Sequence, residues 1–264
     1  MRGFFNSPNL KAARDGLLTT SLTGDQIQCL QRISTTIHKR ELGYLHDNGI
    51  HYIKVGLSAM ECIKTALLSC EAQPPKYILD FPSGYGRVSR FLRAKFPEAS
   101  LHCLELESTA LRFCKREFKA TAWLSKTDFS AINLDQNYDL IWCGSLVTHL
   151  NQSQCQKLIN CMYRHLSPNG ICIFTTHGNR VADFLSRKEL NYSLPPSVIA
   201  DLLNQYQKTG YGFTEYEPAR NGYGFSVSKY EQIEKIGEQS GEWQLRQFIP
   251  AGWDNHQDIY VYQR

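Results

Sequence analysis

The 264-residue sequence lacks several features that would place it in a specialised class of protein. No apolar run approaches the ~20 residues that a membrane span needs, and the N-terminus has no long apolar segment of the signal-peptide type. No Lys/Arg run has the density of a nucleic-acid-binding arm, and the formal charge of +4 is spread along the chain. These absences predict a cytoplasmic protein that binds neither a membrane nor nucleic acid.

The nine cysteines also lack the spacings that would give them a special role. They are odd in number and include no Cys-x-x-Cys pair, which argues against a disulfide framework and against a zinc site. Several fall in predicted strands or on helix faces, where a free thiol behaves as a small apolar residue. We therefore expect reduced, structural cysteines and no bound metal.

The stretch 76–107 is the part of the chain around which the rest is organised. It opens with a short apolar run at 77–79, typical of a strand buried on both faces, which Asp80 closes. A glycine-containing turn at 83–86 follows, then a helical apolar period and a second strand with Glu105 at its end. This order predicts a nucleotide-binding βαβ unit in which Glu105 accepts hydrogen bonds from a ribose diol.

Two residues indicate which ligand this unit fits. Ser89 stands where the dinucleotide fingerprint needs a third glycine, and Asp80 would repel a pyrophosphate but suits a sulfonium and an ammonium group. The stretch resembles motif I of the class I S-adenosylmethionine-dependent methyltransferases, Asp-x-Gly-x-Gly-x-Gly, through Asp80, Gly84 and Gly86. It departs from the motif at Pro82, where the family has its first glycine. An ordinary tight turn is the alternative interpretation.

The later part of the chain resembles the same family. A strand is predicted at 138–146, and Leu-Ser-Pro-Asn-Gly at 166–170 matches the family's turn before its fifth strand. The resemblance implies that Asp128 accepts from the adenine amino group and that Phe129 lies against the ring, although Asp128 can equally begin a turn. The cofactor-binding residues expected for S-adenosylmethionine are Asp80, Ser83, Gly84, Gly86, Glu105, Asp128, Phe129 and Gly144.

The pattern as a whole predicts an α/β fold. We expect a Rossmann-like, seven-stranded, mostly parallel sheet with a terminal antiparallel hairpin, N-terminal helices, and an insertion after strand five. The predicted domains are an N-terminal helical cap at 1–75 and a methyltransferase domain at 76–264, with the insertion at about 179–228. The cap would lie across the ligand pocket or serve as structure alone.

Two helices are expected in this cap. The first would span 26–45, with Ile27, Leu30, Ile33 and Ile37 on one face, and the second would span 56–71. The predicted buried stripe of the second helix consists of Met60, Ile63, Leu67 and Leu68.

Three histidines lie near the carboxyl ends of predicted strands. The ligand crevice of an open α/β sheet lies outside those ends, which favours His149 and His177 over His256. His149 is the first candidate for a base or an acceptor-orienting residue and His177 is the second. A hydrogen-bonded loop histidine is the alternative for each.

The Tyr- and Gly-rich part of the insertion would line the acceptor pocket, or would form a hairpin that packs on the sheet.

Three functions compete. The first is S-adenosylmethionine-dependent O-methylation of a small molecule such as a sugar, a phenol or a natural-product-like acceptor. It is favoured because the chain lacks the Asn/Asp-Pro-Pro-Tyr/Phe motif of amino-methylating enzymes and the Pro-Cys of cytosine-C5 enzymes. The second is a non-catalytic binding module of the same fold, and the third is an NAD-dependent oxidoreductase. The sequence specifies neither the acceptor nor the oligomeric state.

Overall fold

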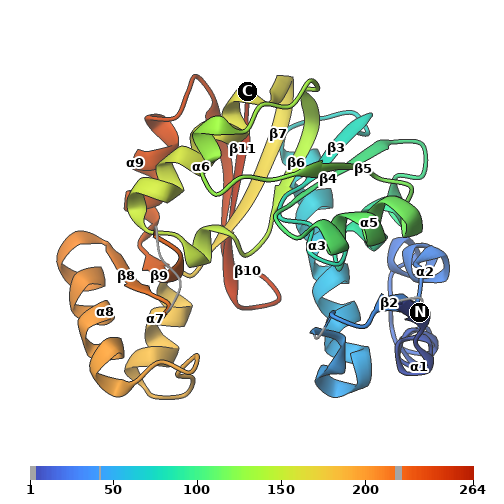
Figure 1. Ribbon diagram of the computed structural model, residues 1–264, viewed down its shortest axis with the longest axis horizontal. Helices are drawn as coiled ribbons and strands as arrows, with labels where there is room; N and C mark the ends of the chain where they lie inside the picture. The colour runs from blue at the N-terminus through green and yellow to red at the C-terminus, as the bar shows by residue number, and fades with distance from the viewer. Residues whose placement is uncertain (1–3, 42, 218–221) are drawn as a thin grey trace. The chain divides into compact units, whose positions relative to one another are not determined.

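The computed structural model describes residues 4–41, 43–217 and 222–264, and its main sheet has seven strands (Figure 1). The strand order is β10-β11-β7-β6-β3-β4-β5. These strands are β3 (Tyr77–Asp80), β4 (Ser100–Glu105), β5 (Thr121–Leu124), β6 (Tyr138–Cys143), β7 (Leu166–Thr176), β10 (Gln244–Trp253) and β11 (Gln257–Gln263). Strands β3, β4 and β5 pair in parallel, as do β6 and β7, whereas β11 pairs antiparallel with β7 and β10. The predicted α/β fold and its terminal antiparallel hairpin are confirmed.

The chain divides into two compact units. The first unit contains residues 1–65 and 73–125, and the second contains residues 66–72 and 126–264. This division cuts through the expected methyltransferase domain rather than separating residues 1–75 from it. The boundary between residues 75 and 76 therefore stays a prediction.

The first unit builds its core around β3, β4 and β5. Helices α4 (Ser89–Lys95) and α5 (Ser108–Glu117) pack on these strands. Phe91 of α4 is fully buried, and a side chain of this kind contributes about 1.5–3 kcal/mol when it leaves water. Its ring lies so close to Gly56 that a Cβ there would overlap it, so α3 (Ile50–Ser69) meets α4 at a glycine.

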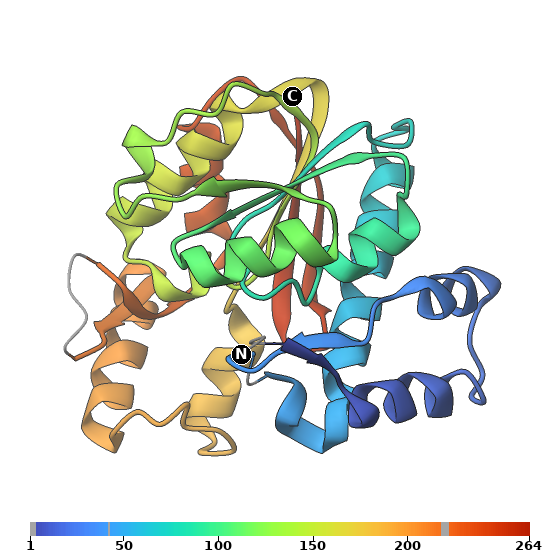
Figure 2. The same cartoon turned by 45° about the vertical axis from the view of Figure 1, so that its right-hand side comes forward.

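The N-terminal part of this unit differs from the prediction. Helices α1 (Pro8–Leu17) and α2 (Gly24–Arg32) are short, and the expected helix over 26–45 ends at Arg32. The next residues form strand β2 (Thr36–His38), which pairs antiparallel with β1 (Phe4–Asn6) (Figure 2), and a 3₁₀ helix spans Gly43–Gly49.

The cause of this error is local. The Ser34 hydroxyl accepts a hydrogen bond from the Thr36 amide, a side-chain contact that competes with helical bonding. The β-branched residues at 35–37 favour strand over helix. Ile33 and Ile37 are nevertheless buried, as the apolar pattern predicted.

The second predicted helix is confirmed as α3, but its buried face is not the one expected. Met60 and Ile63 are buried, whereas Leu68 is 70% exposed. The buried stripe continues instead through Ala59, Cys62 and Ala66, which recur at helical spacing. The inclusion of Leu68 was therefore wrong.

The second unit contains β6, β7, β10 and β11 with helices α6 (Gln152–Arg164) and α9 (Tyr230–Glu238), which contact each other (Figure 1). Phe174 of β7 and Tyr260 of β11 are paired across the strands, with ring centroids 5.2 Å apart. Strand β7 begins earlier than predicted, because Leu166 already pairs with Tyr138 and the residues of the expected turn form an irregularity in the strand. All nine cysteines of the chain are free and buried, as expected.

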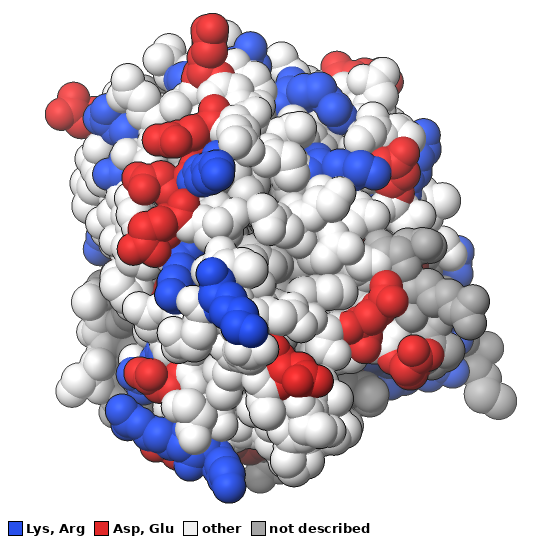
Figure 3. All heavy atoms as spheres, turned by 90° about the vertical axis from the view of Figure 1, so that its left-hand side faces the viewer, with Lys and Arg blue, Asp and Glu red and all other residues white. Residues whose placement is uncertain are grey.

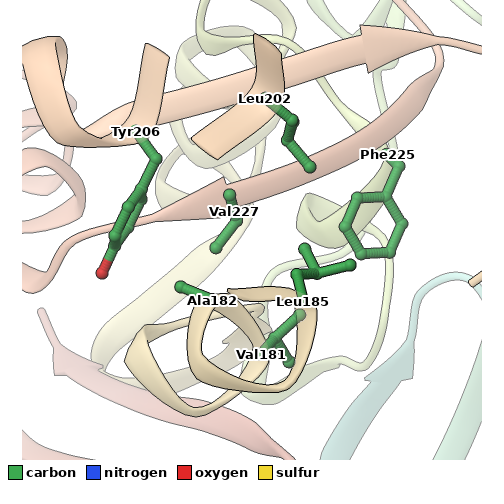
Figure 4. Close-up of a cluster of buried hydrophobic side chains, with 7 residues drawn as sticks. All are labelled: Val181, Ala182, Leu185, Leu202, Tyr206, Phe225 and Val227. Atoms are coloured by element: carbon green, nitrogen blue, oxygen red, sulfur yellow. The ribbon is translucent and has the colours of Figure 1, made fainter. Parts of the chain in front are cut away.

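The insertion forms a layer of its own within this unit. It consists of α7 (Asn179–Ser186), α8 (Pro196–Thr209) and the hairpin of β8 (Tyr211–Glu215) and β9 (Gly224–Ser228). Figure 4 shows the apolar side chains of α7, α8 and β9 that hold these elements together, with the Tyr206 hydroxyl pointing away from the others. The Tyr- and Gly-rich segment thus forms a hairpin, and its residues 218–221 lie outside the described part.

The surface carries no single dominant charge on the face seen in Figure 3, where Lys and Arg side chains are interspersed with Asp and Glu. In the part of the chain that the structure describes, no helix is both long and apolar enough to cross a membrane.

Candidate functional site

The glycine turn between β3 and α4 contains two glycines in the left-handed region. Gly84 has φ +49° and Gly86 has φ +76°, a conformation that other residues adopt only with strain. A Cβ at Gly86 would overlap the ring of Phe118, so packing requires this glycine. Among the described residues other than its two chain neighbours, none has an atom within 4 Å of the position that a Cβ would take at Gly84. Open space for a ligand therefore exists at Gly84 and not at Gly86.

Glu105 lies at the end of β4, as predicted, and its carboxylate faces this turn. One oxygen accepts a 2.9 Å hydrogen bond from the amide of Gly84. The other accepts from the amides of Leu106 at 2.6 Å and Glu107 at 3.3 Å. The carboxylate is therefore held in one orientation beside the open side of Gly84.

Asp80 closes β3, as predicted, and is buried. Its carboxylate accepts a 2.5 Å hydrogen bond from the hydroxyl of Ser89. Burial raises the pKa of Asp80 to about 7, against the opposing effect of Ser89 and with a further increase from the nearby Glu105. Asp80 forms no salt bridge with any described residue. A cationic ligand would supply the positive partner that the carboxylate of this buried acid lacks among the described residues.

Ser83 is buried at the start of the turn. Its amide donates to the carbonyl oxygen of Leu104 and its carbonyl oxygen accepts from the amide of Gly86, so it fixes the turn through its backbone.

His38 of β2 contacts the same turn, and Arg40 contacts Glu107 beside it, which the sequence did not indicate. The imidazole of His38 stacks on Tyr85 with centroids 4.5 Å apart. The Tyr85 hydroxyl donates to Glu107 at 2.7 Å, and Arg40 pairs with the same carboxylate at 2.7 Å. Hydrogen bonds from Thr109 and then Tyr85 lower the pKa of Glu107 to about 2. These contacts were missed because the segment was assigned to a helix.

Two exposed leucines flank Glu105 and were also missed. Leu106 follows it in the chain and is 54% exposed, and Leu124 is its register partner on β5 and is 64% exposed. Large apolar side chains exposed at the carboxyl ends of neighbouring strands are suited to the face of a flat, apolar ligand group. A leucine directly after the predicted acid was the available signal.

In the second unit, Asp128 is exposed and caps the 3₁₀ turn η2 (Phe129–Ala131). Its carboxylate accepts from the amide of Ser130 at 3.1 Å, as its interpretation as the start of a turn implies. Phe129 is buried. An adenine contact for this pair stays a prediction.

Gly144 follows β6, where packing leaves no room for a side chain. A Cβ there would meet the rings of Trp142 and Trp253 at 2.9 Å. The next residue, Ser145, is held through its amide by the hydroxyl of Thr175 at 2.8 Å and through its hydroxyl by Gln257 at 2.8 Å. The loop after β6 is therefore fixed, and it leads into η3 (Val147–His149).

His149 ends η3 and lies half-buried against the β8–β9 hairpin. Its Nδ1 lies 3.0 Å from the carbonyl oxygen of Gly224 and 3.3 Å from the hydroxyl of Tyr216. The ring of Tyr223 stacks on the imidazole with centroids 5.3 Å apart. Burial lowers the pKa of His149, which keeps the imidazole neutral at neutral pH. The structure thus brings the first candidate base together with the aromatic insertion.

His177, the second candidate, follows β7 and is buried. Its Nδ1 lies 3.1 Å from the carbonyl oxygen of Ser226, and Phe225 packs on its ring at 4.7 Å. Burial, followed by the effects of His256 and His149, lowers the pKa of His177 to about 3. An imidazole with so low a pKa is a weaker base than His149.

Nowhere among the described residues do three His, Cys, Asp or Glu side chains form a cluster that could hold a metal ion.

These features define a class. A mostly parallel sheet with an antiparallel terminal hairpin, a glycine turn after its central strand and an acid at the end of the next is the arrangement that the sequence resemblance to class I methyltransferases implies. Residues 78–170 match the family model described as a methyltransferase domain.

The curated relatives agree with this assignment. The chain is 27% identical over 103 residues to a malonyl-(acyl-carrier protein) O-methyltransferase of Priestia megaterium, and the match covers 39% of this chain and 37% of that protein. It is 29% identical over 111 residues to the corresponding enzyme of Bacillus cytotoxicus, covering 42% of this chain and 38% of that protein. This chain thus spans less than two fifths of the length of these two relatives.

A solved structure has the same fold. It is an S-adenosylmethionine-dependent methyltransferase from Clostridium acetobutylicum, with a TM-score of 0.56 and 15% identity over 78% of this chain and 91% of that one. The chain thus contains a class I S-adenosylmethionine-dependent methyltransferase domain, a type of domain whose cofactor is S-adenosylmethionine. The family and the cofactor predicted from the sequence are confirmed.

Proposed function

We propose that this protein transfers the methyl group of S-adenosylmethionine to a hydroxyl oxygen of a small organic acceptor. The observation that carries the proposal is the position of the His149 imidazole, held against the aromatic hairpin just beyond the end of β6. A hydroxyl acceptor must lose a proton as its oxygen bonds to the methyl carbon, and a positioned imidazole is the common base for such a step. His149 would take that proton.

The first unit would hold the cofactor. S-adenosylmethionine supplies an electrophilic methyl group on a cationic sulfonium. Glu105, fixed by backbone amides, would accept from the ribose diol, and the buried Asp80 would face the cationic end of the ligand. The open side of Gly84 would admit the ligand, while Ser83 and Gly86 would hold the turn in shape.

Apolar and aromatic groups would bind the adenine. The exposed side chains of Leu106 and Leu124, which flank Glu105, suit the flat face of the base. Asp128, Phe129 and Gly144 are proposed as cofactor residues on the family resemblance alone.

The second unit would hold the acceptor. Tyr216 and Tyr223 present flat apolar walls with polar ends beside His149, a surface that suits a sugar, a phenol or a natural-product-like ring. His177 remains the second candidate base, although its low pKa makes it the weaker one.

A carboxylate acceptor is the second candidate, because the two curated relatives are named as malonyl-(acyl-carrier protein) O-methyltransferases. A carboxylate is already a nucleophile, so methyl transfer to it needs positioning and no base. The two candidates therefore differ in what they require of His149.

The test is a comparison of His149→Gln with the wild-type protein, together with His51→Gln as a matched control at an exposed histidine. Methyl transfer to a hydroxyl acceptor should fall by ~10²–10⁴ in kcat in His149→Gln, the usual size of a general-base effect. Affinity for S-adenosylhomocysteine should not change. Full activity of His149→Gln on a carboxylic acid would favour the second candidate. Binding of S-adenosylhomocysteine without turnover of any acceptor would favour a non-catalytic module, and binding of NAD instead would contradict the proposal.

A further inference from the structure

We infer that Tyr216 is a positioning residue for His149, and that Nε2 is the nitrogen of His149 that receives the acceptor's proton. The inference rests on the proposed function where it concerns the reaction. Its structural part, the tautomer of His149 and the group that holds it, stands independently of any activity.

The tautomer follows from the partner of Nδ1. The carbonyl oxygen of Gly224, 3.0 Å away, can only accept a hydrogen bond. In a neutral imidazole one nitrogen carries the proton and the other is the acceptor. Nδ1 must therefore be the protonated nitrogen of His149, which leaves the lone pair on Nε2.

Tyr216 holds the ring in this orientation. Its hydroxyl oxygen lies 3.3 Å from the same Nδ1 and can accept a share of the same proton. A rotation of the imidazole by 180° about its bond to Cβ would place a ring C–H where Nδ1–H now lies. Both the Gly224 carbonyl and the Tyr216 hydroxyl would then lose their hydrogen-bond partner, so both contacts favour a single orientation of the ring.

The hairpin that carries these groups is itself fixed. The amide of Tyr216 donates to the carbonyl oxygen of Tyr223 at 3.2 Å, and Tyr223 forms a bridge with Leu150, next to His149 in the chain. A Cβ at Gly224 would overlap the Thr214 carbonyl oxygen, so the strands can approach as closely as they do only with glycine there. The two groups at Nδ1 are thus presented by a backbone that is hydrogen-bonded across the hairpin.

His177 provides an internal comparison. Its Nδ1 faces the carbonyl oxygen of Ser226, and residues 224 and 226 of β9 direct their carbonyls to the same edge of the strand. The same reasoning gives His177 an Nδ1–H tautomer. Among the described residues, however, a tyrosine hydroxyl lies at Nδ1 of His149 and none lies at Nδ1 of His177. The hydroxyl contact therefore distinguishes the histidine proposed to act as base.

The experiment uses the full chain with ¹⁵N-labelled histidine. Nitrogen NMR distinguishes a protonated ring nitrogen from one that carries a lone pair, and the His149 signals are assigned with His149→Gln. Tyr216→Phe removes the hydroxyl and keeps the ring. Tyr192→Phe is the matched control, because it removes a hydroxyl that lies 3.1 Å from a different histidine, His256.

We expect wild-type His149 to show a protonated Nδ1 and an unprotonated Nε2. Tyr216→Phe should shift or broaden these signals and lower kcat for methyl transfer roughly two- to tenfold, the scale of one neutral hydrogen bond, with KM for S-adenosylmethionine unchanged. Tyr192→Phe should leave the His149 signals unaltered.

A protonated Nε2 in the wild-type protein would overturn the assignment of the proton-accepting atom. His149 signals that are the same in Tyr216→Phe and in the wild type would overturn the positioning role of Tyr216. If no acceptor is methylated, the proposed function fails, and the nitrogen spectra still decide the tautomer and the role of Tyr216.

Discussion

The hydroxyl of Ser89 donates a 2.5 Å hydrogen bond to the carboxylate of Asp80, and both side chains are buried. The residue that takes the place of a third glycine in the dinucleotide fingerprint is thus the partner of the acid that closes β3. A hydroxyl donor stabilises the charged form of Asp80, whereas burial opposes it more strongly.

The first prediction concerns the pH dependence of cofactor binding. The pKa of Asp80 is about 7 in the free protein, and a cationic ligand nearby would favour the ionised form. Affinity for S-adenosylmethionine should therefore rise with pH below about 7 and level off above it, with release of a proton on binding. Calorimetry in buffers of different ionisation enthalpy measures that proton. In Asp80→Asn the affinity should be lower and independent of pH over this range.

The same group predicts a stability difference. Its folded-state pKa is raised above the ordinary value of 3.8, so the folded state binds more protons than the unfolded state between those values. The contribution of Asp80 to the free energy of unfolding is therefore most favourable at low pH and is lost as pH rises from about 4 to about 7. In urea titrations, the free energy of unfolding of Asp80→Asn should therefore increase relative to that of the wild type as pH rises from about 4 to about 7. A constant difference between the two proteins from pH 4 to 8 would contradict this.

The second prediction concerns Glu105. Glu105→Ala should weaken S-adenosylhomocysteine binding by roughly 1–3 kcal/mol, because a ribose diol would lose a charged acceptor. Glu98→Ala, at an exposed glutamate of the same unit, should bind as the wild type does. Isothermal titration calorimetry gives both values. Equal affinity of a folded Glu105→Ala protein and the wild type would remove Glu105 from the site.

The third prediction separates the two glycines of the turn. Gly84→Ala should cost about 1 kcal/mol of stability, from the left-handed backbone alone, and should weaken cofactor binding because its methyl group fills the open space. Gly86→Ala should cost about 2–4 kcal/mol, because overlap with Phe118 is added to the same strain. Denaturant unfolding measures the free energy of unfolding of both variants and shows which loses more stability. A larger loss in Gly84→Ala would contradict this account.

The fourth prediction concerns the buried Arg90. One nitrogen of its guanidinium donates to the carbonyl oxygens of Ser34 at 2.6 Å and Thr36 at 3.2 Å, and its plane lies near the rings of Tyr52 and Phe118. Arg90→Ala should lower the free energy of unfolding by about 2–4 kcal/mol, because two carbonyls lose a charged donor and a cavity remains. Arg112→Ala, at an exposed arginine of α5, should be nearly neutral.

The sequence predicted the parts of this protein in which local pattern and tertiary structure agree. The apolar run before Asp80 and the glycine turn after it could both be identified from the sequence, and Glu105 falls at the end of its strand. The segment 33–38 was assigned to a helix because its isoleucines have helical spacing. Pairing of β2 with β1, which are distant in the sequence, decided its structure.

The candidate acceptor site was predicted only as two separate pieces. His149 and the tyrosines of the hairpin were each singled out, but nothing in the sequence joins residue 149 to residues 216 and 224. That contact depends on the pairing of β8 with β9, in which Gly224 packs closely against Thr214. The reason for Gly86 was likewise beyond local pattern, because Phe118 is the group that needs the space.

The identity of the new bond in the methylated product tests the central claim most directly. The protein is incubated with S-adenosylmethionine labelled in its methyl group and with matched hydroxylic and carboxylic acceptors, and the labelled product is treated with mild alkali. Methyl esters hydrolyse under these conditions and methyl ethers survive. We expect a labelled, alkali-stable methyl ether whose formation is lost in His149→Gln. An alkali-labile ester formed equally well by His149→Gln would contradict it.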